Sequence, residues 1–342
     1  MRSAERAGGA PAPSSAPVLR IDNLRTWFHT DAGIVKAVDG VTLAVGQGET
    51  LAIVGESGSG KSVTGLSIMR LLGRTTGRIE GGRIVFRTRR DQAVDLVSLP
   101  EAEITRIRGR DIAMIFQDPM SSLNPVFPVG EQIAEPIRIH RGADRRTARA
   151  MAVDLLRQAG IGDPEKRVDA FPHQLSGGMR QRVMIAIALA CDPKLVIADE
   201  PTTALDVTIQ AQIIALLERL QAERGMALIF VTHDLKLVGE IANQVAVMYA
   251  GEIVEQGPAS AVLAHPRHPY TKALLACTPR RGQRGARLAP IPGALPDPLA
   301  TPVGCRFHPR CGFAKPACTD AAPLLESVSV NHVTRCLRWR EI

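Results

Sequence analysis

Apolar residues gather in short, nearly continuous runs along this chain, separated by longer stretches of mixed character. Five runs have the length of a strand, at residues 50–54, 112–116, 195–198, 227–231 and 245–249. A strand covered on both faces is apolar throughout, whereas a strand with one wet face alternates. We therefore predict an α/β fold built on a mostly parallel core sheet.

The stretch from Val207 to Arg224 has the spacing of a helix with one buried face. Apolar residues recur at this spacing from Ile209 to Leu220, and Gly225 stands where a helix commonly ends. Residues 119–190 show no comparable strand, and a polar helical stretch lies at 143–160. This pattern predicts a helical subdomain inserted into the α/β domain.

The two ends of the chain differ from its middle. Residues 1–17 are rich in Ala, Pro and Ser without an apolar core, which predicts a disordered lead and no secretory signal. After Thr278, prolines recur too often for a long helix or a central strand. We therefore expect a main domain at 18–278, with the helical subdomain at about 119–190, and a C-terminal extension at 279–342.

The charge narrows the function only a little. A net charge of +8 suits a nucleic acid, an anionic membrane face or an anionic substrate, and does not choose among them. No apolar run approaches the ~20 residues of a membrane-spanning helix. If the protein works at a membrane, other chains must span it.

The motif GESGSGKS at residues 55–62 follows one predicted strand directly and precedes a helical run. Such glycines let the backbone curl so that N–H groups point at phosphate oxygens, next to the positive end of a helix. Lys61 can reach the β- and γ-phosphates, and the Ser62 hydroxyl can bind Mg²⁺. The alternative is a flexible glycine-rich turn. We assign ATP binding to Gly55, Glu56, Ser57, Gly58, Ser59, Gly60, Lys61, Ser62 and Val63.

The run LVIADE, residues 195–200, ends a predicted strand in two carboxylates. A phosphate-binding-loop enzyme needs an acid at a strand end to hold Mg²⁺, and Asp199 fits that role. Glu200 can orient and deprotonate the attacking water. The alternative is two acids that begin a surface turn.

The motif LSGGM at residues 175–179 would on its own be a plain helix cap. Next to the phosphate-binding loop and the acidic strand, it resembles the signature of the ATP-binding-cassette family. The resemblance covers residues 17–278 and implies an antiparallel β subdomain beside the α/β core. It also implies a head-to-tail dimer, in which each ATP lies between one phosphate-binding loop and the partner's signature, here Ser176, Gly177, Gly178 and Met179.

The same resemblance implies roles for four further residues. Phe28 matches the aromatic that stacks on adenine, although a core position is the alternative. Gln117 matches the glutamine that senses Mg²⁺ and the γ-phosphate, so it joins Ser62 and Asp199 as a metal-site residue. Asp206 matches the loop that touches the partner ATPase, and it would also serve as a helix cap. His233 matches the histidine at the γ-phosphate, which makes Glu200, His233 and Lys61 the catalytic set.

Residues 107–137, 268–275 and 304–311 resemble ATPase subunits of dipeptide and oligopeptide importers, most closely the D-type subunit. This resemblance implies ATP hydrolysis that powers peptide import from the cytoplasmic face of the inner membrane, where the protein is peripheral. It implies a second, F-type ATPase subunit, two membrane permease subunits and an extracytoplasmic peptide-binding protein. The alternative is a nucleic-acid-associated ATPase of this fold with a zinc-binding tail. That class generally has tandem cassettes or a coiled-coil insertion, so we expect no nucleic-acid partner.

Four of the six cysteines lie in the extension, at Cys305, Cys311, Cys318 and Cys336. In a reducing compartment, clustered cysteines bind metal more often than they form disulfides. Their spacing lacks the tight knuckles of structural zinc sites. Together with the importer resemblance, the spacing favours a [4Fe–4S] cluster over Zn²⁺ or unligated thiols. Nearby basic residues would offset its charge, namely Arg306, Arg310, Lys315, Arg335 and Arg338.

Overall fold

The computed structural model describes residues 16–72, 76–203, 205–277 and 290–342. Nearly all of the predicted disordered lead and residues 279–289 of the predicted extension therefore lie outside the described residues. The domain boundaries drawn from the sequence remain predictions.

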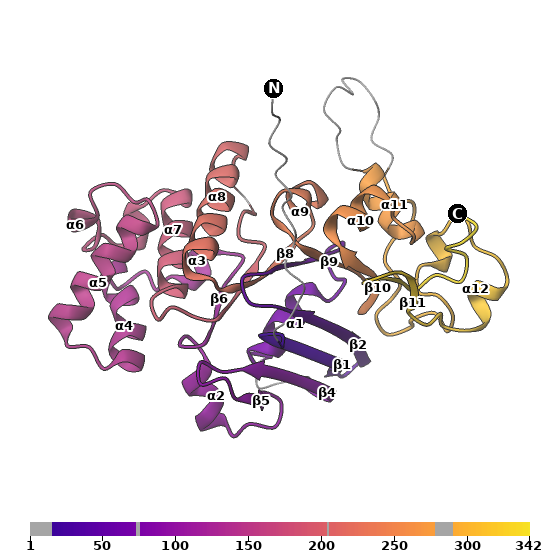
Figure 1. The fold of residues 1–342 in the computed structure, drawn as a ribbon, viewed down its shortest axis with the longest axis horizontal. Coiled ribbons are helices and arrows are strands. Elements are labelled where there is room, and N and C mark those ends of the chain that lie inside the picture. Colours follow the sequence, from indigo (N-terminus) through magenta and orange to yellow (C-terminus); the bar gives the residue numbers. More distant parts are fainter. Residues whose placement is uncertain (1–15, 73–75, 204, 278–289) are drawn as a thin grey trace, which may run out of the picture.

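Two sheets form the centre of the molecule (Figure 1). The smaller, antiparallel sheet has the order β2-β1-β4-β5, with strands Gly33–Val45, Leu19–Thr30, Gly77–Arg87 and Ala93–Asp95. The larger sheet has the order β11-β12-β10-β9-β3-β8-β7-β6. Its strands in that order are Glu326–Ser329, His332–Thr334, Glu252–Pro258, Gln244–Tyr249, Thr50–Val54, Ala227–Thr232, Leu195–Asp199 and Ile112–Ile115.

The five apolar runs singled out in the sequence become the parallel strands β9, β3, β8, β7 and β6. Their residues are buried almost throughout, because helices or the smaller sheet cover both faces. Strands β10, β12 and β11 then extend the sheet in antiparallel fashion. The prediction of an α/β fold on a parallel core is confirmed, and the complete sheet is mixed.

The chain between β6 and β7 contains five α-helices, which lie together at one side of the larger sheet (Figure 1). Asp144 starts one of them by accepting a hydrogen bond from the Thr147 amide at 2.8 Å. Their buried faces pack on one another around Ile133, Leu156 and Val183. The five helices are α3 (Pro119–Ser122), α4 (Val129–Arg141), α5 (Arg145–Gln158), α6 (Pro164–Arg167) and α7 (Gly177–Ala188).

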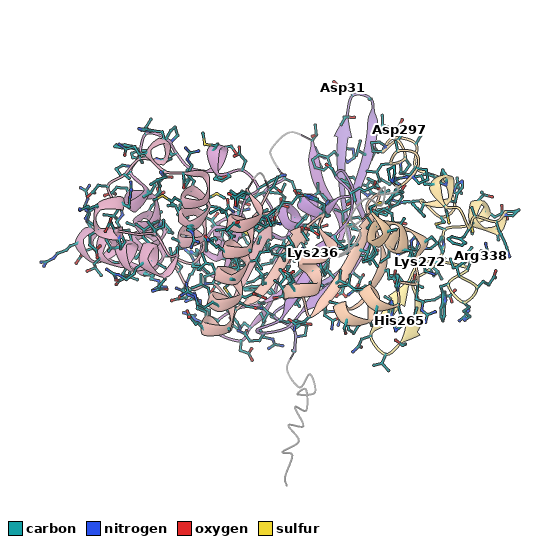
Figure 2. The ribbon with its side chains drawn as sticks, turned by 90° about the horizontal axis from the view of Figure 1, so that it is seen from above. Asp31, Lys236, His265, Lys272, Asp297 and Arg338 are labelled. Atoms are coloured by element: carbon teal, nitrogen blue, oxygen red, sulfur yellow. The ribbon has the colours of Figure 1, made fainter. Side chains whose placement is uncertain are left out.

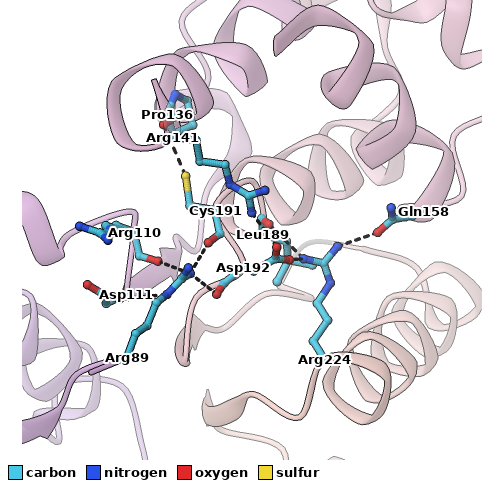
Figure 3. Close-up of polar contacts among 10 residues, drawn as sticks. All are labelled: Arg89, Arg110, Asp111, Pro136, Arg141, Gln158, Leu189, Cys191, Asp192 and Arg224. Carbon is cyan, nitrogen blue, oxygen red and sulfur yellow. Dashed lines mark hydrogen bonds and ion pairs between the residues drawn. The ribbon is translucent and has the colours of Figure 1, made fainter. Parts of the chain in front are cut away.

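A polar cluster connects these helices to the sheet just before β7 (Figure 3). The Asp192 carboxylate accepts a hydrogen bond of 2.6 Å from Arg141 at the end of α4, and another from Arg224. Arg224 also donates to the Gln158 side chain at the end of α5, at 2.6 Å. The Cys191 thiol donates to the Pro136 carbonyl inside α4 at 3.4 Å. The turn at Asp192 therefore binds the end of α4 directly and is connected to the end of α5 through Arg224.

The helix predicted at Val207–Arg224 is present as α8. The Asp206 carboxylate caps it by accepting from the Ile209 amide at 2.9 Å, and Gly225 ends it in the left-handed conformation at φ 60°. The predicted apolar face is buried except at Ile209, which is only partly covered. The remaining helices are α1 (Lys61–Ile68), α2 (Glu101–Ile107), α9 (Leu235–Ile241), α10 (Ala259–Ala264), α11 (Pro269–Ala276) and α12 (Ala317–Asp320).

The C-terminal residues dock on the sheet through a buried polar group and an aromatic cluster. Strand β12 pairs with β10, where Glu255 is fully buried. The Glu255 carboxylate accepts backbone hydrogen bonds from Arg267 and His268 and lies 2.8 Å from the ring nitrogen of His332. Phe307 packs edge-on against Tyr249 on β9. In the part of the chain that the structure describes, no helix is both long enough and apolar enough to cross a membrane.

Candidate nucleotide site

The phosphate-binding loop, residues 55–60, joins β3 to the start of α1. Its turns depend on glycine, since Gly58 has φ 82° and Gly60 has φ 103°. A Cβ on Gly60 would lie 2.2 Å from the Ala37 carbonyl oxygen of β2. The loop therefore lies tightly against the smaller sheet, and the N-terminal turn of α1 opens at its end.

The Lys61 side chain folds back across this loop and is almost fully buried. Its ammonium donates to the carbonyl oxygens of Gly55 and Glu56, each at 2.9 Å. Burial lowers the pKa of this ammonium, and the nearby carboxylates of Glu200 and Asp199 oppose that effect. If a phosphate entered the loop, its oxygens would replace these two carbonyl oxygens as acceptors for the Lys61 ammonium.

Ser62 and Asp199 form the next contact of the site. The Ser62 hydroxyl donates to the Asp199 carboxylate at 2.9 Å, and Asp199 ends β7 in a buried position. Burial raises the pKa of the Asp199 carboxyl, although the Ser62 hydrogen bond acts against this. Hydroxyl and carboxylate oxygens are ligands that Mg²⁺ prefers, and Mg²⁺ completes its shell with phosphate oxygens and water. These two residues therefore fit a magnesium ion bound together with a nucleotide.

The Glu200 carboxylate is the meeting point of three chain segments. Its Oε2 accepts from the Thr203 hydroxyl at 2.8 Å and from the Gln117 amide, which follows β6, at 3.2 Å. The Nδ1 atom of His233, which follows β8, lies 3.3 Å from the same oxygen. The Glu200 backbone has φ 45°, and its amide donates to the Val231 carbonyl at 2.9 Å. Backbone and side-chain contacts therefore fix the direction of this carboxylate.

A cavity of about 690 Å³ brings most of the predicted residues together. Gly55 and Ser59 are not among its lining residues, and Asp199 reaches the site through Ser62. Five lining residues were not assigned to the site from the sequence, namely Ala37, Gly293, Ala294, Leu295 and Arg310. The predicted residues that line it are Glu56, Ser57, Gly58, Gly60, Lys61, Ser62, Val63, Gln117, Glu200 and His233.

Phe28, the four signature residues 176–179 and Asp206 also lie outside the cavity lining. The Phe28 ring packs against Gly77, where an added Cβ would lie 2.8 Å from the ring. Ser176 caps α7 by accepting from the Met179 amide at 3.3 Å, and Asp206 caps α8. The signature residues therefore start a helix away from the phosphate-binding loop of their own chain.

Sequence analysis also missed the contact of Thr203 with Glu200. Thr203 stands three residues after the glutamate, which is a visible spacing, but only the left-handed turn at Glu200 directs the two side chains at each other.

Comparison with known proteins decides the family. Residues 38–203 match the family model of ABC transporters, and residues 254–318 match the C-terminal region of oligopeptide and dipeptide transporters. A putative peptide import ATP-binding protein of Brucella melitensis is 55% identical over 335 residues, which cover 96% of this chain and 99% of the relative. The chain belongs to the ATP-binding-cassette transporter family. It is therefore an ATP-binding-cassette ATPase.

Two further comparisons support the family and the fold. The dipeptide transport ATP-binding protein DppD of Escherichia coli is 50% identical over 319 residues, 93% of this cassette chain and 96% of the relative. A dimeric ATP-binding cassette solved in a post-hydrolysis state with ADP and phosphate has a TM-score of 0.62 at 29% identity. It covers 70% of this chain and 98% of its own. The cassette fold with its antiparallel β subdomain is confirmed, as is the resemblance to peptide importer subunits.

The prediction of an iron–sulphur or other metal centre in the tail was wrong. All four tail cysteines lie in the part of the chain that the structure describes, and that part contains no group of three or more His, Cys, Asp or Glu side chains placed to hold a metal ion. The four thiols line a cavity of about 20 Å³, which has room for about one water molecule. Burial raises the pKa of Cys305 to about 11 and also raises those of Cys311 and Cys336. Protonated thiols are poor metal ligands.

The basic residues expected to balance such a centre have other partners. Arg306 pairs with Asp39 and lies 3.4 Å from Glu252. Arg335 donates to the carbonyl oxygens of Ile253 and Pro323, each at 3.0 Å. Lys315 and Arg338 both pair with Glu341, and Arg310 pairs with Glu56.

Proposed function

We propose that this protein hydrolyses ATP to power the import of dipeptides or oligopeptides through a binding-protein-dependent transporter. The observation that carries the proposal is the match of residues 254–318 to the C-terminal region of oligopeptide and dipeptide transporters, in a chain whose phosphate-binding loop and oriented Glu200 share one cavity. The relatives reported above are named for peptide or dipeptide transport. None of these findings favours the alternative of a nucleic-acid-associated ATPase.

The geometry of the cavity supports the role that we propose for each site residue. Lys61 and the loop amides of residues 55–63 bind the β- and γ-phosphates. Ser62 and Asp199, with Gln117 next to them, hold Mg²⁺, which neutralises charge on the phosphates. Glu200 takes the proton of the attacking water in this proposal. Gln117 and Thr203 donate to its carboxylate, and the His233 ring lies 3.3 Å from the same oxygen, so the carboxylate is held at the cavity wall.

Two further residues complete the site in this proposal. His233 contacts the γ-phosphate from beside Glu200. Phe28, which packs against Gly77 and is partly exposed, stacks on the adenine.

The second half of each ATP site comes from another ATPase subunit in this proposal. Ser176 and the amides of Gly177 and Gly178, followed by Met179, lie at the N-terminus of α7, where a γ-phosphate is favoured. Asp206 contacts the partner in the closed dimer. Hydrolysis then requires closure, which transmits the mechanical step to other subunits.

The proposed assembly contains an F-type ATPase subunit, two permease subunits and an extracytoplasmic peptide-binding protein. This chain lies peripherally at the cytoplasmic face of the inner membrane. Three large apolar side chains are exposed just after Gln117, namely Met120, Val126 and Phe127 at 63%, 69% and 52%. Exposed apolar groups that follow Gln117 so closely in the chain are suited to contact the permease. In this proposal the segment after Gln117 connects the permease to the nucleotide.

The test is the variant Glu200→Gln in the assembled transporter. Glutamine keeps the size of the side chain but cannot accept the proton, so ATP binding should persist while turnover falls by about 10²- to 10⁴-fold. ATPase activity and uptake of a labelled dipeptide are measured in proteoliposomes that contain all subunits.

The matched control is Glu223→Gln, at an exposed glutamate on α8. It should keep the wild-type rates. Wild-type ATP turnover in Glu200→Gln would refute the role of Glu200. If the assembled transporter hydrolysed ATP but took up none of the peptides tested, peptide import would be refuted.

A further inference from the structure

A segment of the C-terminal extension runs along the nucleotide cavity. We call residues 290–299 the strap. Gly293, Ala294 and Leu295 line the cavity, and a Leu295 methyl lies 3.6 Å from the position that a Cβ would take on Gly58. Further along, a Leu299 methyl lies 3.2 Å from the corresponding position on Gly33, the first residue of β2. The strap therefore spans from the phosphate-binding loop to the start of β2. Figure 2 labels Asp297 of the strap and Asp31, two residues before β2.

One guanidinium fastens the strap to the phosphate-binding loop. The side chain of Arg310 is 4% exposed, and its two Nη atoms lie 2.7 and 3.0 Å from the two carboxylate oxygens of Glu56. Its Nε donates to the Pro292 carbonyl at 2.8 Å, and one Nη donates to the Tyr249 hydroxyl at 3.3 Å. A planar guanidinium can hold a carboxylate at two points, which a lysine ammonium cannot do. Arg310 therefore joins the loop, the strap and the sheet at a single point.

The charge of Glu56 makes this contact important for an anionic ligand. Glu56 is the second residue of the phosphate-binding loop and lines the same cavity as Lys61. An unpaired carboxylate at that place would repel a triphosphate. The hydrogen bonds with Glu56 raise the pKa of the Arg310 guanidinium, so it stays charged and offsets the carboxylate.

We propose that Arg310 is a positioning residue of the nucleotide site and that the strap forms one wall of that site, against which bound ATP packs. Arg310 neutralises Glu56 and holds Gly293–Leu295 over the loop. This inference rests on the proposed ATPase function, and it gives the C-terminal extension a direct part in holding the nucleotide. The extension is thus a component of the ATP site as well as an addition to the sheet edge.

The proposal predicts a pattern that a merely structural arginine would not give. In Arg310→Gln the half-buried Glu56 carboxylate loses its partner, so ATP affinity falls about tenfold and nucleotide release becomes faster. In the double variant Glu56→Gln/Arg310→Gln the repelling charge is gone, and affinity returns to within about threefold of the wild type. Arg310→Lys keeps the charge without the two-point contact and gives an intermediate affinity.

The experiment uses the purified full-length chain and a fluorescent ATP analogue, with equilibrium titration for the Kd and stopped-flow mixing for the release rate. Leu295→Ala tests the wall independently and is expected to speed release about threefold by removing apolar contact. The matched control is Arg340→Gln, at an exposed arginine of the same extension that pairs with Glu326. It should bind the analogue like the wild type. Thermal melts of every variant check that each one folds.

Two results would overturn the proposal: an unchanged or tighter Kd in Arg310→Gln, or a double variant as weak as Arg310→Gln alone. If Arg310→Gln does not fold, unchanged binding in both Arg310→Lys and Leu295→Ala overturns it. If the wild type does not bind ATP, the proposed function is refuted together with this inference. If the wild type binds ATP and the variants bind it equally well, this inference alone is refuted.

Discussion

A buried histidine makes the stability of this protein sensitive to mild acid. His268 is fully buried at the start of α11, where its Nδ1 accepts a hydrogen bond from the Tyr270 amide at 3.1 Å. That bond requires a neutral ring, because a protonated imidazole has no acceptor. Burial lowers the pKa of His268 to about 3. The ring therefore has to stay neutral for the native fold at this end of the sheet.

The sign and size of the effect follow from linkage. The folded pKa lies below the unfolded value of about 6.5, so below pH 6.5 the unfolded chain binds the extra proton and stability falls as the pH decreases. Each pH unit within this window costs about 1.4 kcal/mol, which amounts to about 2 kcal/mol at pH 5. The loss would stop growing near pH 3, where the folded protein also binds the proton.

Protonation of His268 would also affect the nucleotide site. The Tyr270 hydroxyl accepts a hydrogen bond from the Glu56 amide at 2.8 Å, so the first turn of α11 supports the phosphate-binding loop. Loss of the His268 cap would loosen that support. We therefore expect ATP binding to weaken over the same pH range in which the fold loses stability.

The assay compares urea unfolding at pH 7.5 and pH 5 for the wild type and His268→Asn. Asparagine can cap the helix and does not titrate, so the wild type should lose about 2 kcal/mol more than the variant between the two pH values. His265→Asn, at an exposed site in the same region, controls for the loss of one histidine. Equal losses in the wild type and His268→Asn would refute the reasoning.

Three further changes test the local geometry. Gly60→Ala should abolish binding of a fluorescent ATP analogue, since a Cβ would lie 2.2 Å from the Ala37 carbonyl and the backbone has φ 103°; wild-type affinity would contradict the described loop. Asp206→Ala should lower the free energy of unfolding by about 1 kcal/mol through loss of the α8 cap, and a urea titration that shows no change would exclude that role. Asp192→Ala removes the carboxylate between two arginines in Figure 3 and should cost about 1 kcal/mol, seen as a lower melting temperature; an unchanged melting temperature would show that these ion pairs do not stabilise the fold.

The predictions that were confirmed rest on patterns among residues that are close together in the sequence. The parallel strands were recognisable because strands buried on both faces are apolar along their whole length, as residues 50–54 are. The phosphate-binding loop was recognisable because its glycines, Lys61 and Ser62 are neighbours in the chain. Helix α8 was recognisable from its buried spacing and its ending glycine.

The sequence did not reveal long-range placement, and its one error was chemistry inferred from spacing alone. The prolines of the extension argued only against a long helix or a central strand, and the short strands that it does contain were not predicted: β12 pairs with β10, and β11 forms the edge of the sheet. The spacing of the tail cysteines suggested ligands of an iron–sulphur cluster. Burial instead favours protonated thiols, and the cavity that they line is too small for such a cluster.

What the sequence determined by itself is the set of segments and the groups that neighbours in the chain can supply: the core strands, the phosphate-binding loop, and the acid pair at Asp199 and Glu200. Only the tertiary structure decided which distant groups meet them. Arg310 and Glu56 are 254 positions apart and pair because the extension folds back over the loop. Local patterns record backbone geometry and burial, whereas such a pairing depends on how the whole chain packs, which no short stretch of sequence encodes.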